Sequence, residues 1–368
     1  MTLSLYITRR FLSAFAIVLL SFWGVLFLID MVEKIRSFAS AGITLGQAAM
    51  LSALSVPQSL YDILPLVMVL SAVVLFLGLA RSSELVVIRA AGMSALRLVL
   101  TPVSVALLIG VLAVAIGNPI VSATAKRYDT VAGKFRAGGA ESASISSDGI
   151  WMRQGMGDGS GQQAVIHGAR ANPNATRLYD VTFLIVAPGQ GAVRRIEAEE
   201  ANLTPGAWHL SNVKDWPLGS STNPERDATR ADSLTLSSSL TAERIRDSFG
   251  SPSAVPIWQL PGFIRGIEAA GFSARRHMVW FQMELALPIV LAAMVLIAAG
   301  FNMAHIRFGK SGMMVLITLG AGLSVFFLRN IAQVLGDNGE IPVGLAAWAP
   351  PAIALMLALA LVLAREDG

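Results

Sequence analysis

The sequence contains no cysteine among its 368 residues. This absence excludes disulfide-bonded scaffolds, thiolate zinc sites and iron–sulfur clusters. Charge is also scarce, because only 14% of the residues are Asp, Glu, Lys or Arg, whereas 54% are hydrophobic. A typical soluble domain carries about 25% charged residues, so a bilayer must accommodate the excess of apolar side chains. The net charge of +4 is too small to indicate a nucleic-acid-binding protein.

Catalytic and metal-binding patterns are scarce as well. The four histidines, His167, His209, His277 and His305, show no ligand spacing, and no Gly-x-Ser-x-Gly motif is present. We therefore expect no metal, no cofactor and no enzymatic activity. The segment 304–311 fits a relaxed phosphate-binding loop, but it joins two apolar stretches and not a strand and a helix. We interpret it as a basic loop.

Six apolar stretches are long enough to span a membrane, which takes about 20 helical residues. They cover 11–29, 59–80, 98–117, 278–299, 313–334 and 343–363. The intervening region has no such stretch and is rich in Gly, Ser, Asn, Asp and charge. The sequence predicts an α-helical integral membrane protein in a three-plus-three arrangement. Residues 1–121 hold the first three spans, 122–275 a domain in water, and 276–368 the last three spans.

The distribution of Lys and Arg in short loops predicts the orientation, because cytoplasmic loops carry an excess of these residues. One side holds only Lys34 and Arg36. The other side holds Arg9, Arg10, Arg81, Arg89, Arg97, Arg307, Lys310 and Arg365. Both termini are therefore expected in the cytoplasm and the large domain outside.

Short runs of β-branched and aromatic residues punctuate the large domain, at 149–153, 163–167, 180–186 and 207–210. Gly, Pro and Asn clusters separate them, as is typical of turns between strands. This spacing predicts an all-β domain, an antiparallel sandwich or jelly roll.

Two charged residues lie within predicted spans, where ionised groups are costly and are usually paired or functional. Glu284 is about six residues from the outer end of the fourth span and Arg329 about five from that of the fifth, so their depths match. We predict an ion pair, with Asp62 in the same polar layer; a patch that touches a lipid headgroup is the alternative. Gly320 and Gly322 are interpreted as packing glycines or a movable helix seam.

The loop after the second span predicts a short helix at about 82–92. Ser82 or Ser83 can cap it, Glu84 lies in its first turn and Gly92 can end it. Ser94 can cap the next helix. A short helix between two spans is what a transport permease needs to receive motion from a cytoplasmic ATPase, although it can also be a mere connector.

The segment 83–94, Ser-Glu-Leu-Val-Val-Ile-Arg-Ala-Ala-Gly-Met-Ser, resembles the coupling helix of the LptF/LptG permeases of lipopolysaccharide export. Further similarity lies at 29–34, 54–57 and 270–277, closer to the G-type subunit than to the F-type. The resemblance covers essentially the whole chain. It implies a permease subunit that extracts lipopolysaccharide from the outer leaflet of the inner membrane of a Gram-negative bacterium, with a periplasmic β-jellyroll domain.

The resemblance also implies partners and site residues. The partners are a paralogous LptF-like permease, an LptB-like ATPase dimer that hydrolyses ATP, a single-span LptC-like protein and a periplasmic LptA-like jelly-roll protein. The implied ATPase-coupling residues are Glu84, Leu85, Ile88, Arg89 and Gly92. Lys34 matches a basic position beside the lipid phosphates; Arg36, Lys126 and Arg127 have suitable chemistry and location.

Two sets of alternatives stay open from the sequence. The outer cations either bind phosphate, pair with Asp30, Glu33 or Asp129, or contact ordinary headgroups. The function is either lipopolysaccharide export, another lipid- or lipoprotein-extruding ABC permease, or a membrane-anchored periplasmic enzyme or sensor. The last would need a convergent polar site in 122–275, which the sequence does not reveal.

Overall fold

The computed structural model describes residues 2–39, 42–133, 135, 142–146, 149–156, 162–172, 176–219, 221–238, 252–269, 273–303 and 311–364. Most of segment 304–311, with its resemblance to a phosphate-binding loop, lies outside these residues. The chain divides into two compact units. A helical unit comprises Met1–Arg136, Ser253–Trp258 and Arg275–Gly368, and a sheet unit comprises Ala137–Pro252 and Gln259–Ala274.

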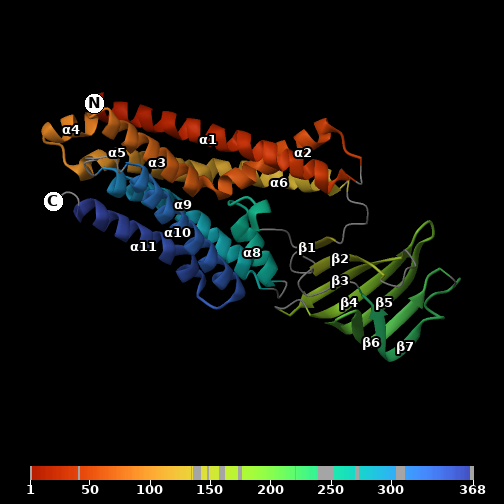
Figure 1. Ribbon diagram of the computed structural model, residues 1–368. Helices are drawn as coiled ribbons and strands as arrows, with labels where there is room; N and C mark the ends of the chain where they lie inside the picture. Colours follow the sequence, from red (N-terminus) through yellow and green to blue (C-terminus); the bar gives the residue numbers. More distant parts are fainter. Residues whose placement is uncertain are drawn as a thin grey trace. The chain divides into compact units, whose positions relative to one another are not determined.

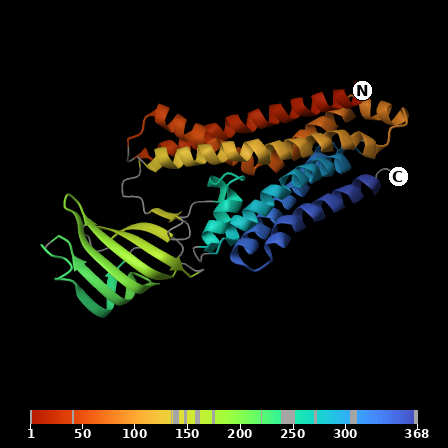
Figure 2. The same cartoon turned by 180° about the vertical axis from the view of Figure 1, so that it is seen from behind.

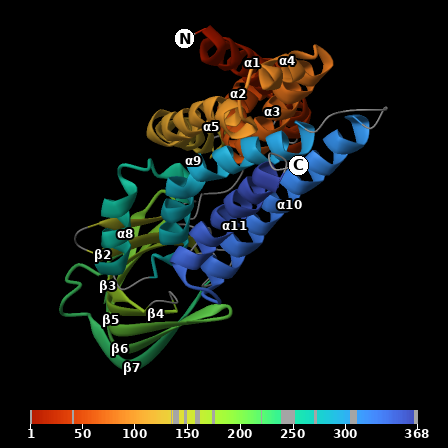
Figure 3. The same ribbon diagram turned by 90° about the vertical axis from the view of Figure 1, so that its left-hand side faces the viewer.

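The helices of the helical unit are α1 (Thr2–Ser37), α2 (Leu45–Asp62), α3 (Leu64–Arg81), α4 (Glu84–Ala90), α5 (Ala95–Leu112), α6 (Asn118–Gly133), α9 (Arg275–Asn302), α10 (Ser311–Asn338) and α11 (Val343–Ala364). Within the described residues, six helical segments are long and apolar enough to cross a membrane: Leu3–Ser37, Leu64–Arg81, Ala95–Gly133, Arg275–Asn302, Gly312–Asn338 and Val343–Ala364. The six predicted apolar spans are thus confirmed as helices. Helices α9, α10 and α11 lie side by side (Figures 1 and 3).

The second predicted span is interrupted near its start. Helix α2 ends at Asp62 and α3 begins at Leu64, with Pro65 in the first turn of α3. Proline lacks an amide hydrogen, so it interrupts a helix interior but is tolerated in a first turn. The interruption leaves half-buried Tyr61 and exposed Asp62 at the end of α2.

The third span is longer than predicted. Helix α5 passes through a π-helical segment, η2 (Ala113–Gly117), into α6, so helix continues to Gly133, beyond the expected domain boundary at 122 (Figure 2). Gly110 allows α5 to approach α9, because a Cβ atom there would lie only 2.5 Å from Cα of Pro288.

The two glycines predicted on the fifth span differ in their surroundings. A Cβ atom at Gly322 would lie 3.1 Å from Cγ1 of Val69 in α3, so this glycine is at a close helix contact. A Cβ atom at Gly320 would meet nothing within 4 Å. Of these two predicted positions, Gly322 therefore acts as a packing glycine and Gly320 does not.

The described strands form one antiparallel sheet in chain order. They are β1 (Ser142–Ser146), β2 (Gly149–Gly155), β3 (Gln163–Ala171), β4 (Arg177–Ala187), β5 (Gly191–Thr204), β6 (Ala207–Pro217) and β7 (Thr229–Ser237), with helix α8 (Leu260–Ala269) in the same unit. The four predicted runs lie in β2, β3, β4 and β6. The predicted jelly roll stays a prediction, because these strands all belong to one sheet.

Alternate residues of the strands are buried, so the sheet has one apolar face. Trp208 of β6 is fully buried there and lies edge-on to Phe183 of β4, with ring centroids 6.0 Å apart. The sheet is curved (Figures 1 and 2), and this curvature brings side chains of non-adjacent strands together.

Candidate functional site

The short helix predicted at 82–92 is present as α4, Glu84–Ala90. Gly92 follows it with a φ of 83°, a left-handed conformation that glycine adopts without strain. Ser94 then caps α5, because its hydroxyl oxygen accepts a hydrogen bond from the amide of Arg97 at 3.2 Å. The predicted end of this helix and the cap of the next are therefore confirmed.

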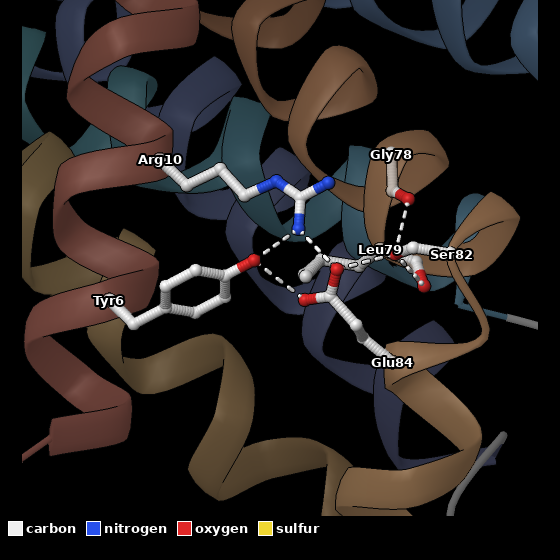
Figure 4. Close-up of polar contacts among 6 residues, drawn as sticks. All are labelled: Tyr6, Arg10, Gly78, Leu79, Ser82 and Glu84. Atoms are coloured by element: carbon white, nitrogen blue, oxygen red, sulfur yellow. Dashed lines mark hydrogen bonds and ion pairs between the residues drawn. The ribbon is translucent and has the colours of Figure 1, made fainter.

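The carboxylate of Glu84 binds three side chains, two of them from α1 (Figure 4). The Tyr6 hydroxyl donates to Oε2 at 2.8 Å, and Nη1 of Arg10 donates to Oε1 at 2.7 Å. The Ser82 hydroxyl lies 2.6 Å from Oε1. The hydrogen bonds from Ser82 and Arg10 hold the pKa of the Glu84 carboxyl below its ordinary value. Glu84 therefore anchors α4 to α1 as an anion.

The other side chains of α4 separate into two faces. Leu85 and Ile88 are 6% and 8% exposed and face the bundle, where α4 contacts α3. Val86 and Val87 are 51% and 67% exposed. The Arg89 side chain is not among the described ones. The predicted coupling residues Leu85 and Ile88 thus fix α4 in place, whereas the valines, which the sequence reading did not single out, form its outer face.

Lys34 lies in the last turn of α1 and already has partners in the chain. Its Nζ atom is 3.3 Å from the Asp30 carboxylate and 4.9 Å from the centre of the Tyr128 ring in α6. Asp30 also accepts a hydrogen bond from Ser55 at 2.6 Å. The Lys34 side chain is only 13% exposed. The pairing with Asp30, one of the alternatives open from the sequence, is therefore present.

The other three predicted lipid-binding cations are more open. Arg36 near the end of α1, and Lys126 and Arg127 on α6, are exposed. None of them forms an ion pair with another described residue. The ends of α1 and α6 are held near each other by an apolar cluster of Phe38, Leu51 and Ala132. These cations therefore stand at one end of the helical unit.

Glu284 of α9 is fully buried and binds neutral partners. The Tyr61 hydroxyl donates to its Oε2 atom, as does the Asn118 amide at 3.3 Å. Its Oε1 atom has no hydrogen-bond partner among the described residues, and Glu284 lines a cavity of about 300 Å³. The cavity is lined by Tyr61, Asp62, Trp280, Glu284, Leu287, Phe326, Arg329, Asn330 and Gln333.

The predicted direct ion pair between Glu284 and Arg329 is absent. Both residues are described, and no nitrogen of Arg329 lies within the 4.0 Å of the Glu284 carboxylate that defines an ion pair. Equal depth along two helices does not bring their side chains together: Tyr61 and Asn118 bind Oε2, while Arg329 lines the cavity from α10 beyond ion-pair distance of either carboxylate oxygen. The predicted polar layer is present, since Asp62 and Arg329 border the same cavity.

Several residues of these sites could not be found from local patterns. Tyr6 and Arg10 are four apart and share a helix face, which is the only sequence signal that they act together. Tyr61 and Asn118 meet Glu284 across 223 and 166 residues. Arg275 donates to the carbonyl of Gly336 at 2.6 Å, which fastens the end of α10.

Comparison with known proteins links this architecture to a transport family. The family model described as "Lipopolysaccharide export system permease LptF/LptG" matches residues 5–364. A protein named lipopolysaccharide export system permease protein LptG from Haemophilus influenzae is 23% identical over 342 residues, 92% of this chain and 91% of that protein. The protein of the same name from Escherichia coli K12 is 24% identical over 371 residues, 98% and 96% of the two chains.

The family match extends over nearly the whole chain, so it includes the apolar helices, α4 and the sheet unit. The relatives are permeases and not enzymes, in agreement with the absence of catalytic motifs in the sequence. The chain therefore belongs to the LptF/LptG permease family.

Proposed function

We propose that this chain is a permease subunit that extracts lipopolysaccharide from the outer leaflet of the inner membrane of a Gram-negative bacterium and passes it to a periplasmic bridge. The observation that carries this proposal is the family match from residue 5 to residue 364. The LptG-type names of the relatives support a G-type subunit.

The proposed topology has both termini in the cytoplasm and three spans on each side of a periplasmic domain. The preponderance of Arg in short loops on the side of Arg9, Arg10, Arg81 and Arg97 supports it. The curved antiparallel sheet with one apolar face would be the jelly-roll domain through which the acyl chains of the lipid pass.

Helix α4 is proposed as the coupling element that receives the motion of an LptB-like ATPase dimer. Its valines, Val86 and Val87, are exposed, and an apolar surface of this kind is typical of a contact with another protein. Glu84 would transmit movement to α1, because its carboxylate is bound to Tyr6 and Arg10. In this scheme Leu85 and Ile88 contribute by seating α4 against α3.

The cations at the end of α1 and α6 are proposed to bind the lipid phosphates. Arg36, Lys126 and Arg127 are exposed and outside the ion pairs of the described residues. Lys34 would share its ammonium group between Asp30 and a phosphate oxygen, since an ammonium has three donors. If these cations only contacted ordinary lipid headgroups, phosphatidylglycerol would stimulate the assembly as well as lipopolysaccharide does.

The proposed partners are an LptF-like permease, the ATPase dimer, and LptC-like and LptA-like proteins. The test is co-expression of this chain with an LptF-like permease and an LptB-like ATPase, followed by purification in detergent. We expect a stable assembly whose ATPase activity rises with added lipopolysaccharide and not with phosphatidylglycerol. Stimulation by a lipoprotein, or equal stimulation by both lipids, would favour another extruding permease instead.

A further inference from the structure

An amphiphilic groove lies at the opposite end of α1 from Lys34. It has a volume of about 560 Å³ and runs between α1 and α3, which pack against each other. Tyr6, Arg9 and Arg10 line its polar end. Ile17 and Val74, which are 63% and 50% exposed, line its apolar end together with Ala14 and Leu75.

The polar end carries hydrogen-bond donors for which the described residues show no acceptor. The hydrogen bonds described for Arg10 all come from Nη1, which binds Glu84 and Tyr6. Its Nη2 atom lies over Gly78, where a Cβ atom would be 3.3 Å away, so glycine leaves room for the guanidinium. Arg9 is exposed and forms no ion pair with a described residue. Arg9 and Arg10, the latter already paired with Glu84, therefore line one end of a groove whose lining among the described residues includes no carboxylate.

The dimensions of the groove match a phospholipid. Ile17 follows Arg10 by seven residues, or about 10 Å along a helix, so the cations and the exposed apolar side chains stand at successive depths of one bilayer leaflet. A protein carboxylate would satisfy the arginines but would leave the apolar half of the groove uncovered. A phospholipid suits both ends of the groove. Its phosphate accepts charge-assisted hydrogen bonds from the arginines, and its acyl chain covers the apolar side chains.

We propose that an anionic phospholipid binds between α1 and α3, with its phosphate on Arg9 and Arg10 and an acyl chain over Ile17 and Val74. The bound phosphate also orients Arg10 toward Glu84, because one edge of the guanidinium faces the lipid and the other the carboxylate. The site is separate from the proposed lipopolysaccharide-binding cations Lys34, Arg36, Lys126 and Arg127, since Lys34 and Arg36 lie at the other end of α1.

Native mass spectrometry of the full chain with its co-purified subunits tests this proposal. Phosphatidylglycerol and phosphatidylethanolamine are titrated against the wild-type protein, Arg9→Gln and Val74→Trp. We expect each substitution to weaken phosphatidylglycerol binding by about fivefold or more, one by removing a charged hydrogen-bond donor and the other by filling the groove. Val74→Ala leaves the groove open and should retain binding.

Arg97→Gln is the matched control, because Arg97 is another exposed arginine near a helix start but does not line the groove. It should change binding by less than about twofold. An equal loss in Arg97→Gln would show a diffuse surface charge effect and overturn the proposal. Unaltered binding by Val74→Trp, or full competition by inorganic phosphate or glycerophosphoglycerol, would show a phosphate site without an acyl chain and would overturn it too. Equal affinity for phosphatidylethanolamine would contradict the requirement for an anionic lipid.

Discussion

Nη1 of Arg10 lies 2.7 Å from Oε1 of Glu84, although 74 residues separate the two in the chain. This contact joins the first long helix to the short helix α4. A force that displaces α4 must therefore either move α1 or break the contact. The side chains of both residues are 32% exposed, so a partner protein or solvent can compete for them.

Removal of the Arg10 cation should loosen α4. For Arg10→Gln we expect faster hydrogen exchange of the amides in 84–90, with the free energy of local opening lowered by about 0.5–1 kcal/mol, because the ion pair is partly exposed. Arg97→Gln is the control, since Arg97 is exposed, forms no ion pair with a described residue and does not line the groove beside Arg10. Exchange that is unaltered in Arg10→Gln, or equally fast in Arg97→Gln, would show that the contact does not hold α4.

The same contact predicts a pH dependence. The pKa of Glu84 is lowered by the hydrogen bonds from Ser82 and Arg10, so its contribution to holding α4 is present above the ordinary carboxyl pKa of 4.5 and is lost as the pH falls through the lowered value. Hydrogen exchange of α4, corrected for the intrinsic rate, should be the same at pH 7 and pH 5. Protection that is already lost at pH 5 would contradict the lowered pKa, and in Glu84→Gln the acid-induced loss should disappear.

Lys34 offers a test that separates lipid binding from internal pairing. Lys34→Gln should lower the recovery of lipopolysaccharide with the purified assembly by about tenfold, the equivalent of one charged hydrogen bond. Asp30→Asn removes the internal partner, 3.3 Å away, and should leave recovery equal or higher because the ammonium is then free for phosphate. If both variants lose lipid to the same extent, Lys34 serves only to hold the end of α1.

Hydropathy was enough to predict the six spans, because burial of about 20 apolar residues dominates insertion into a bilayer. Gly92 and Ser94 were also sufficient to predict a helix end and a helix start. Glycine adopts a positive φ without strain, and a serine hydroxyl can accept a hydrogen bond from a free amide in the first turn of a helix. The strand β5 was missed, since residues 194–200 are mostly charged and hide its apolar alternation. The break between α2 and α3 was also missed. Pro65 is compatible with a helix start there, but the apolar stretch continues across it and predicted one uninterrupted span.

The partners of Glu84 and Glu284 could not be predicted, because contacts across 78, 74 and 223 residues depend on how helices pack. Matching depth suggested Arg329 as the partner of Glu284. Depth alone does not fix which face of a helix a residue occupies, and the structure brings Tyr61 and Asn118 to the carboxylate instead.

This arrangement predicts unequal energetic coupling around Glu284. A double-mutant cycle of Tyr61→Phe with Glu284→Gln should give a coupling free energy of about 1–2 kcal/mol, since the hydroxyl binds a fully buried carboxylate. The cycle of Glu284→Gln with Arg329→Gln should give a smaller value. Unfolding in detergent measures both cycles, and a larger coupling with Arg329 would restore the ion pair predicted from the sequence.

Export of lipopolysaccharide by this chain, as one subunit of an ATP-driven assembly, is tested most directly by a transfer measurement. Lipopolysaccharide moves from proteoliposomes that contain the co-purified assembly to a soluble periplasmic acceptor protein, and photocrosslinking follows this transfer over time. We predict transfer that requires ATP and this chain, and that falls when the chain carries Lys34→Glu. Transfer that proceeds equally without this chain, or an intact assembly that hydrolyses ATP and transfers no lipopolysaccharide, would contradict the claim.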